Sequence, residues 1–525
     1  MAKSETVARA AYLSWSQLLA RNLASIGLPQ AFLIVTFGAT AILAQYEPWN
    51  QPSLGDRANW DYFSQVIVRG GVPYKDVVNI KSPLSAYIGA GSILASRPFG
   101  VRDVIAIRLA FMALIALVCG CTLMVVVRYH GGAGLGFIAA AVVLCFDPFV
   151  RSHNAGVQPK TPMVLFGLLS LWAIAEDRPF FAGLCGMLSA LSWQPGLLFV
   201  GVAALTFSRY LTAWGDLKAV KVLLGAVSPL AILIVYFWAA GALRDFFLWT
   251  VHFNATVYGP NELRTISGSI SRLGRIIDED YNAGKIFFYA AVAGVIIAIG
   301  RELRRAGAGG IRLLIQSAPR HSVILAALGY LGFCMIDMQG GADLIPLLPF
   351  VGIFSAILFG FLLDFAVDLA TRFRPAQNAA AIEKWGRAAV CFAVLALGAG
   401  RAYSYRLGSP TLKDQDVEVS GITANLESGD KIFVHGLTEV LVLSGLNNAS
   451  KYFLLDRGKD GYLELLEPGG FDGWFDRLKA EKPKVVLIDR LKRVDRRASF
   501  QSWVNENYEA REGPLFKYYL RRDNE

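Results

Sequence analysis

Long apolar segments recur along most of this chain, and they constrain its fold more than any other feature. They follow one another from about residue 26 to about residue 402, with short polar stretches between them. Segments of this kind suit helices that cross the ~30 Å hydrocarbon core of a bilayer. Only 18% of the residues are charged, against about 25% in a typical soluble protein, and the mean hydropathy is +0.43. We therefore predict a polytopic α-helical membrane protein rather than a large soluble one.

We predict about eleven transmembrane helices. They cover residues 26–44, 104–127, 132–147, 161–175, 180–192, 194–207, 222–241, 284–300, 322–336, 345–363 and 387–402. The short pair 180–192 and 194–207 is ambiguous, because Ser192-Trp-Gln-Pro195 between them is either a tight turn or a kink in one long helix. Counting two crossings places the later Arg- and Lys-rich loops on the cytoplasmic side, together with the N-terminus. We therefore keep two crossings.

The two ends of the chain differ from its apolar middle. Residues 1–25 are polar and show no signal-peptide cleavage site, so we expect a cytoplasmic N-terminal segment before a transmembrane domain at 26–402. Residues 403–525 have the composition of a soluble domain, which this topology places outside the cytoplasm. Strand-like runs there alternate with helix-like stretches, which favours a small α/β domain with a largely parallel sheet. The strand-like runs are 431–436, 451–456, 484–489 and 515–520, and the helix-like stretches lie near 438–445, 471–481 and 499–508.

Charge and cysteine content argue against several kinds of partner. Much of the excess in the net charge of +10 lies in short loops, where it sets orientation, so we expect no nucleic acid. The six cysteines all fall in apolar segments and show neither metal-ligand spacing nor a disulfide framework. No Gly-x-Gly-x-x-Gly follows a strand-like run, and no Asp-x-Asp or histidine cluster has suitable spacing. We predict no metal ion and no cofactor.

A dense group of charged residues follows the first apolar segment. In the predicted outer loop 45–103, these residues are Asp56, Asp61, Lys75, Asp76 and Lys81. Charged groups held at a membrane edge are costly unless they have a task. Carboxylates beside lysines suit a reaction that removes a proton and neutralises a phosphate. We therefore predict that this loop is catalytic.

The order of residues in this loop resembles the first periplasmic loop of the GT-C glycosyltransferases. The closer resemblance is to the bacterial branch akin to protein O-mannosyltransferases and lipid A aminoarabinose transferases. That family shows Asp-Glu-x-x-Tyr, a short helix, a Gly, and a Lys-Pro or Lys-x-Pro element before an apolar segment. Here Asp56 takes the acidic position, Trp60 the aromatic one and Lys81 the lysine, while Arg57 replaces the usual Glu. Further elements look similar to the family's: Arg151-Ser-His-Asn154, Gln158-Pro-Lys160, Trp193-Gln-Pro195 and Asp337-x-Gln-Gly-Gly-x-Asp343.

The resemblance implies a glycosyltransferase that uses a polyprenyl-phosphate sugar donor. We expect a multi-pass protein of the bacterial inner membrane that transfers a hexosyl or pentosyl group, with inversion, to an acceptor on the extracytoplasmic side. A glycan, a lipid, a protein and a small polyol all stay open as acceptors. In this reaction Asp56 acts as general base and Lys81 binds the phosphate. The structural alternatives are a helix-terminal carboxylate paired with Arg57 or Lys81, and a surface lysine.

Further candidates lie in the same loop and in later outer loops. Asp61 and Asp76 are the other candidate catalytic carboxylates, although helical geometry would turn Asp61 about 140° away from Asp56. Asp76 follows Tyr74 in a turn-like Pro-Tyr-Lys-Asp, where capping is the structural alternative. The stretch 249–258 is typical of an interfacial amphipathic helix that holds the prenyl chain or gates the site. Residues predicted to bind substrate, besides Lys81, are Arg57, Tyr74, His153, Asn154, His252, Tyr258, Arg264, Arg272 and Arg275.

Two other functions fit an apolar chain with charged outer loops. A transporter or flippase for a lipid-linked sugar would show an internal repeat or charges near the middle of the bilayer. No repeat is visible, and Arg108 and Asp364 are the exceptions to a pattern that places charges in outer loops. A non-catalytic envelope assembly protein would use the C-terminal domain for docking. Loss of activity in a folded Asp56→Asn protein would separate an enzyme from both.

Overall fold

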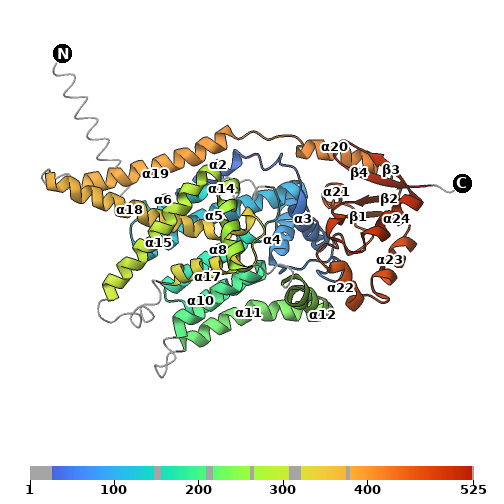
Figure 1. Cartoon of the computed structure of the whole chain (residues 1–525), viewed down its shortest axis with the longest axis horizontal. Helices are drawn as coiled ribbons and strands as arrows, with labels where there is room; N and C mark the ends of the chain where they lie inside the picture. The colour runs from blue at the N-terminus through green and yellow to red at the C-terminus, as the bar shows by residue number, and fades with distance from the viewer. Residues whose placement is uncertain are drawn as a thin grey trace, which may run out of the picture.

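A helical bundle at one end and a small mixed sheet with its own helices at the other make up the fold (Figure 1). The computed structural model describes residues 27–146, 155–208, 217–259, 265–306, 321–373 and 379–522. Two shorter helices of the first outer loop, α3 (Gly55–Val68) and α4 (Leu84–Ser96), lie between these two parts. The loop that carries the predicted catalytic residues therefore sits at the junction of the bundle and the C-terminal part.

Each predicted apolar segment forms a helix. The bundle contains α2 (Leu28–Ala44), α5 (Asp103–His130), α6 (Ala133–Leu144), α8 (Lys160–Ala175), α9 (Pro179–Ser192), α10 (Leu197–Ser208), α11 (Lys218–Ala239), α15 (Lys285–Ala306), α17 (Ser322–Ile336), α18 (Leu348–Phe373) and α19 (Ala379–Ser404). In the described ranges, four helical stretches are long and apolar enough to cross a membrane: Asp103–His130, Lys218–Ala239, Lys285–Arg304 and Gly341–Arg372. The other apolar helices are shorter. The helices are thus confirmed, while about eleven crossings stays a prediction.

The segment 179–208 folds as two antiparallel helices and not as one kinked helix. Helix α9 ends at Ser192, Trp193 is extended with φ −156° and ψ 133°, and the short turn η2 (Gln194–Gly196) leads into α10. The two helices lie so close that a Cβ added at Gly186 would be 2.9 Å from the backbone nitrogen of Val200. This confirms the tight-turn interpretation and leaves Trp193 and Gln194 at an end of the bundle.

Small residues let the bundle helices approach one another closely. A Cβ added at Gly183 of α9 would overlap the carbonyl oxygen of Val222 in α11, and one at Gly225 would overlap that of Phe180. Such backbone-to-backbone packing is typical of membrane helices, where little hydrophobic driving force exists between apolar surfaces. Substituting either glycine with a larger residue would push α9 and α11 apart.

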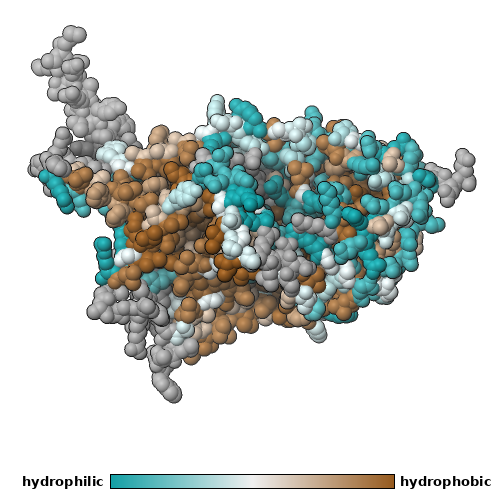
Figure 2. All heavy atoms as spheres, viewed as in Figure 1, coloured by the Kyte–Doolittle hydropathy of each residue, from teal (hydrophilic) through white to brown (hydrophobic). Residues whose placement is uncertain are grey.

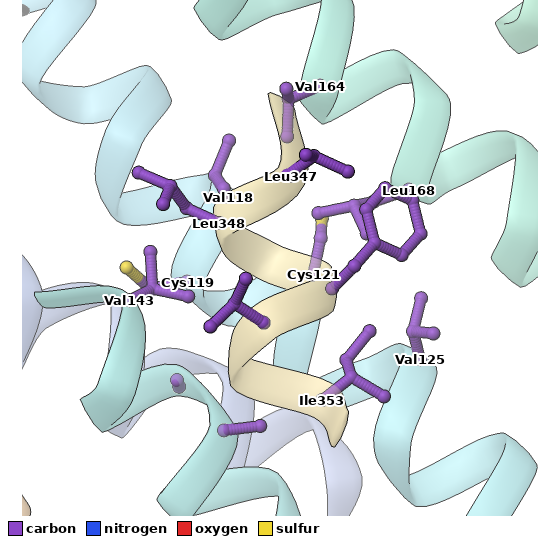
Figure 3. Close-up of a cluster of buried hydrophobic side chains, with 14 of the residues drawn as sticks. Val118, Cys119, Cys121, Val125, Val143, Val164, Leu168, Leu347, Leu348 and Ile353 are labelled. Atoms are coloured by element: carbon purple, nitrogen blue, oxygen red, sulfur yellow. The ribbon is translucent and has the colours of Figure 1, made fainter. Parts of the chain in front are cut away.

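The bundle is apolar both inside and on its surface. Figure 3 shows part of its interior, where α5, α6, α8, the end of η9 (Gly341–Leu347) and the start of α18 bring together Val118, Cys119, Cys121, Val125, Val143, Val164, Leu168, Leu347, Leu348 and Ile353. Figure 2 shows hydrophobic side chains over much of the bundle surface and hydrophilic ones over most of the C-terminal part. Exposed examples in the bundle are Phe37 at 70% and Ile232 at 72%. A soluble protein rarely exposes such a surface, whereas a bilayer would cover it.

The C-terminal part contains a four-stranded mixed sheet. Its strands, in spatial order, are β1 (Ile432–His435), β2 (Val485–Ile488), β4 (Lys517–Arg521) and β3 (Tyr508–Glu512). Strands β1 and β2 are parallel, while β4 runs antiparallel to both of its neighbours. The helices there are α20 (Leu412–Thr423), α21 (Glu439–Ser444), α22 (Lys459–Leu466), α23 (Gly470–Ala480) and α24 (Arg497–Asn507). The prediction of an α/β arrangement agrees with these elements, but a largely parallel sheet is wrong.

The predicted strand at 451–456 is also wrong. Tyr452, Phe453 and Leu455 are buried as a strand would bury them, but the segment forms a loop. It is attached to the end of β1 by one backbone hydrogen bond, from the N–H of Gly436 to the carbonyl of Phe453 at 2.8 Å. A short apolar run carries the same signal whether it is buried in a strand or in a loop, so its sequence alone does not separate the two.

The first outer loop is docked on the C-terminal part by both polar and apolar contacts. The backbone N–H and C=O of Ser53 pair with the amide of Gln415 at 2.7 and 2.8 Å. Arg102 makes a bidentate pair with Asp416 at 2.7 and 2.8 Å. Buried side chains of α3, including Phe63, share one apolar cluster with the sheet. These contacts fix the position of α3, and with it the position of Asp56.

Candidate active site

A cleft opens between the C-terminal part and the end of the bundle that faces it. Two adjoining pockets of about 820 and 570 Å³ share Asp56, Lys81 and Lys160. The larger one is also lined by apolar side chains of the bundle, among them Trp193, Phe333 and Ile336. A smaller pocket of about 110 Å³ continues from Asp56 and Lys81 to residues 456–459 of the C-terminal part. All three residues matched to the family motif, Asp56, Trp60 and Lys81, thus line one continuous cleft.

Asp56 lies in the first turn of α3 and points into this cleft. Leu54 is extended and Gly55 has φ +61°, a conformation that suits glycine and turns the chain sharply into the helix. The Asp56 side chain is 82% exposed, and its nearest cation is Arg490 Nη1 at 3.7 Å. The N-terminus of a helix stabilises a carboxylate. Asp56 is therefore an accessible carboxylate held by a rigid element, as a general base must be.

Hydrogen bonds on both sides hold the backbone at Lys81. The carbonyl of Ile80 accepts from the amides of Gln194 and Asn254, at 3.0 and 2.6 Å. The carbonyl of Lys81 accepts from the hydroxyl of Tyr74 at 2.7 Å. Tyr74 is itself buried, so it supports the site from behind and does not line the cleft. These contacts also explain the Trp193-Gln-Pro195 element, because its Gln positions Lys81.

The ammonium group of Lys81 faces the cleft without a carboxylate partner. Its Nζ lies 5.7 Å from the centre of the Trp193 ring, and among the described residues no carboxylate comes within 4.0 Å of it. Burial, helped by the nearby Lys160, lowers the pKa of Lys81, while Asp56 and Asp343 act in the opposite direction. An unpaired, partly desolvated cation of this kind suits an anionic ligand.

Lys160 differs from Lys81 because it has a fixed partner. Its Nζ lies 4.8 Å from the centre of the same Trp193 ring and 2.8 Å from Asp343 Oδ1. The two side chains are only 9% and 14% exposed. Asp343 Oδ2 also accepts the backbone N–H groups of Gln339 and Gly340, at 2.7 and 3.1 Å. Asp343 therefore organises the loop before η9 (Gly341–Leu347) and fixes Lys160.

Tyr258 reaches the cleft from another direction. It ends the π-helical turn η5 (Asn254–Tyr258), and its hydroxyl accepts hydrogen bonds from Gln339 and, at 3.1 Å, from Arg457. Arg272, in α14 (Ile266–Asp280), donates to the carbonyl of Gln339 and does not line the three pockets of the cleft. Tyr258 is thus placed to touch a ligand, whereas Arg272 supports the loop that Tyr258 contacts.

The C-terminal part supplies the opposite wall, which the sequence interpretation left out of the site. Asp456, Arg457 and Lys459 line the smallest pocket. Lys459 pairs with Asp456 at 2.6 Å, and Arg457 lies over the Tyr258 ring at 5.5 Å from its centre. Burial would raise the pKa of Asp456, but Lys459 and Arg457 hold it below its usual value. The run Asp456-Arg-Gly-Lys459, directly after a buried apolar stretch, was the sequence signal available for this wall.

The other two candidate carboxylates lie away from the cleft. Asp61 is fully buried on another face of α3, and its Oδ1 accepts the backbone N–H of Val157 at 2.8 Å. Burial raises the pKa of Asp61 to about 7, although this hydrogen bond and the charges of Arg108 and Arg57 oppose the shift. Asp76 closes a turn, since its Oδ2 accepts the backbone N–H of Val72 at 2.7 Å. The helical turn expected to separate Asp61 from Asp56 is confirmed.

The remaining predicted residues are divided between the cleft and other places. Arg57 lines the 570 Å³ pocket. His252 lies in η4 (Leu248–His252), where its Nδ1 is 2.7 Å from the hydroxyl of Tyr462, so it contacts the C-terminal part instead of the cleft. Arg275 is exposed on α14 and lines none of the three pockets of the cleft. Three further candidates lie outside the described residues: His153, Asn154 and Arg264.

The stretch 249–258 is not a regular interfacial helix. It forms the π-helical turns η4 and η5, and Trp249 is buried at 1% exposure. The Trp249 ring packs against Tyr452 and Tyr462 of the C-terminal part, at 6.1 and 5.2 Å between ring centres. Val251, at 48% exposure, faces outward. One side of this segment therefore packs on protein, and its position between the bundle and the C-terminal part was not visible from its amphipathic pattern.

Solved structures with a similar fold exist for other proteins. The chain superimposes on ArnT from Cupriavidus metallidurans bound to undecaprenyl phosphate with a TM-score of 0.57 and 12% identity, over 93% of this chain and 97% of that one. For the archaeal oligosaccharyltransferase AglB from Archaeoglobus fulgidus, in complex with an inhibitory peptide and a dolichol-phosphate, the TM-score is 0.54 at 12% identity, over 94% of this chain and 74% of that one. No protein-family model matches the chain, and no curated protein matches it in sequence.

The bundle, the loop 45–103 and the C-terminal part are thus arranged as they are in these two solved structures. The chain has the fold of the ArnT and AglB structures along nearly its whole described length. The resemblance found in the first outer loop is confirmed at the level of the fold.

Proposed function

We propose that this protein is an integral membrane glycosyltransferase that takes one sugar from a polyprenyl-phosphate donor. The observation that carries the proposal is the joint position of Asp56 and Lys81. One is an exposed carboxylate at a helix N-terminus, the other is a partly desolvated cation with no carboxylate partner among the described residues, and both line one cleft. The two side chains line the same three pockets of this cleft. A proton acceptor beside a phosphate-binding cation is what sugar transfer from a phosphate requires.

The larger pocket suits the lipid phosphate donor. Its walls combine the Lys81 ammonium with apolar side chains at the outer end of the bundle, including Trp193, Phe333 and Ile336. A polyprenyl chain would lie along the apolar side while the phosphate meets Lys81. The two similar structures are complexes with undecaprenyl phosphate and a dolichol-phosphate, which supports a ligand of this class here.

In the proposed reaction Asp56 accepts the proton of the acceptor hydroxyl. The acceptor oxygen forms a bond to the anomeric carbon on the face opposite the phosphate, and the bond from that carbon to the phosphate oxygen breaks. The electron pair of the broken bond stays on the phosphate, where Lys81 neutralises the charge that develops. The anomeric configuration inverts. We place the reaction on the extracytoplasmic face of a bacterial inner membrane, with the C-terminal part on that side.

Sugar transfer in membranes tests this proposal. Wild-type protein and Asp56→Asn are supplied with radiolabelled polyprenyl-phosphate sugars, and labelled acceptor is separated from labelled donor. Transfer by wild type and none by folded Asp56→Asn would support the enzyme and its base. Transfer by both proteins would mean that the general base is a residue other than Asp56. No transfer with any donor would favour the transporter or the assembly protein, and movement of labelled lipid across the membrane without transfer would separate these two.

A further inference from the structure

The 570 Å³ pocket contains groups that the donor does not need. It extends for about 570 Å³ from Asp56 over the ends of β1 and β2, where it is lined by Gly436, Glu439, Asp489 and Arg490. In sheets with parallel strands, ligands bind beyond the carboxyl ends of the strands, because the loops there diverge. A volume of about 300–1,000 Å³ is typical of a small-molecule pocket. This pocket meets the donor pocket at Asp56, where an acceptor hydroxyl has to arrive.

Glu439 is the feature that points to a ligand. The residue is 5% exposed and lines the pocket, and its Oε2 has no hydrogen-bond partner among the described residues. An unsatisfied buried oxygen is costly, and a ligand hydroxyl would satisfy it. Burial raises the pKa of Glu439 to about 7, although its own backbone N–H and Arg490 oppose the shift. Near neutral pH the carboxyl group can therefore accept a hydrogen bond or, when protonated, donate one.

The backbone around Glu439 is held rigidly. Gly436 has φ +84°, and a Cβ there would lie 2.8 Å from the carbonyl oxygen of Asp489. The hydroxyl of Thr438 donates to Asn59 of α3 at 2.5 Å, which ties this turn to the helix that carries Asp56. A group bound at Glu439 would therefore keep a fixed position relative to Asp56.

We propose that this pocket is the acceptor subsite and that it binds a carbohydrate, whose hydroxyl groups bond to Glu439, Asp489 and Arg490. The inference rests on the proposed function. The two acidic groups and one guanidinium on this wall carry no excess positive charge, so they suit neutral hydroxyl groups better than a phosphate. The other cations of the pocket, Arg57, Lys81 and Lys160, come from the opposite wall, formed by the loop 45–103 and the start of α8. Carboxylates accept from sugar hydroxyls and a guanidinium donates to them.

Binding of ligands to the purified full chain tests the subsite separately from the donor site. The probes are neutral trisaccharides of glucose, mannose and galactose, a peptide rich in Ser and Thr, and undecaprenyl phosphate, each titrated by ligand-observed NMR. We expect wild type to bind a trisaccharide. Glu439→Gln and Asp489→Asn should each weaken this binding about tenfold, which corresponds to one lost hydrogen bond to a charged group. Undecaprenyl phosphate affinity should stay unchanged in both variants, which also shows that they fold.

Glu509→Gln is the matched control, because Glu509 is an exposed glutamate in β3 at the far edge of the same sheet. It should bind both kinds of ligand as wild type does. The subsite is overturned if wild type binds undecaprenyl phosphate but no trisaccharide, if the peptide binds in place of the sugar, or if Glu439→Gln and Asp489→Asn leave trisaccharide affinity unchanged. Failure of wild type to bind undecaprenyl phosphate would instead contradict the proposed function.

Discussion

Each wall of the cleft contains one fixed lysine, but the C-terminal wall adds two more exposed arginines. On the bundle side, the Lys160 side chain is 9% exposed and paired with Asp343, and the backbone at Lys81 is fixed by three side-chain hydrogen bonds. On the C-terminal side, Lys459 is similarly fixed, at 11% exposure and paired with Asp456 at 2.6 Å, but Arg457 and Arg490 are 23% and 38% exposed. A fixed cation defines where a phosphate lies, whereas an exposed one adds screened attraction. We infer that the bundle wall sets the geometry of the reaction and that the C-terminal wall adjusts binding.

The largest effect should come from the residue between the two walls. Replacing Asp56 by Asn removes the proton acceptor while keeping the shape of the side chain. Transfer should fall by about 100- to 10,000-fold, the usual contribution of general acid–base catalysis. Undecaprenyl phosphate affinity, measured by titration, should not fall. Wild-type transfer rates in this variant would show that Asp56 is not the proton acceptor.

Breaking the Lys160–Asp343 pair should affect stability before it affects chemistry. Lys160→Met leaves the buried Asp343 carboxylate without its cation, which costs about 3–5 kcal/mol in comparable pairs. The melting temperature in detergent should drop sharply, and the double variant Lys160→Met/Asp343→Asn should recover part of it. Additive losses in the double variant would show that the two residues act independently.

Lys81 should behave in the opposite way to Lys160. It has no carboxylate partner among the described residues, so Lys81→Met leaves no orphaned charge and should melt close to wild type. Loss of a charged hydrogen bond to phosphate should weaken undecaprenyl phosphate binding by about 10- to 100-fold. Equal thermal losses in Lys81→Met and Lys160→Met would contradict the proposed division between a binding lysine and a structural one.

The raised pKa of Asp61 predicts that the stability of the folded protein depends on pH. Its pKa is raised in the folded protein, to about 7, so the folded state holds a proton that the unfolded state releases. Its contribution to stability is therefore present at low pH and is lost as the pH rises toward 7, by up to about 4 kcal/mol. Asp61→Asn does not titrate, so its melting temperature should fall less than that of wild type between pH 5 and pH 8. Parallel curves for the two proteins would place the Asp61 pKa near its ordinary value.

The smallest effect is expected on the C-terminal wall. Arg457→Gln removes a partly exposed cation, and such groups typically contribute about 0.2–1 kcal/mol. Undecaprenyl phosphate should bind about two- to fivefold less tightly at low salt, and the difference should shrink as salt is added. A loss as large as that of Lys81→Met would mean that both walls hold the phosphate equally.

The two walls of the cleft also differ in how far the sequence could predict them. Apolar periodicity located every bundle helix, because a membrane segment must be apolar along most of its length. The resemblance of the Asp56–Lys81 segment to a family motif located one side of the cleft, because both residues belong to that one local motif. Trp193, Gln194 and Asp343 were noticed as family-like elements, but their contacts with Lys81 and Lys160 appear only when the helices are packed.

The C-terminal wall could not be located in this way. Arg457 and Arg490 reach the cleft because α3 is docked on the C-terminal part through long-range contacts such as Ser53 with Gln415 and Arg102 with Asp416. The strand prediction at 451–456 failed for a related reason, since burial of an apolar run does not reveal whether it pairs in a sheet. Charge alone could not show that Asp61 lies away from the cleft, where its buried carboxylate holds a loop.

A structure of the full-length protein with undecaprenyl phosphate, determined by electron cryo-microscopy, would test the central claim most directly. We expect phosphate density in the larger pocket, within hydrogen-bond distance of Lys81 Nζ. The Asp56 carboxylate should face this phosphate, and the prenyl chain should lie along Phe333 and Ile336. Phosphate bound away from Lys81, or on the far side of the C-terminal part from Asp56, would contradict the account.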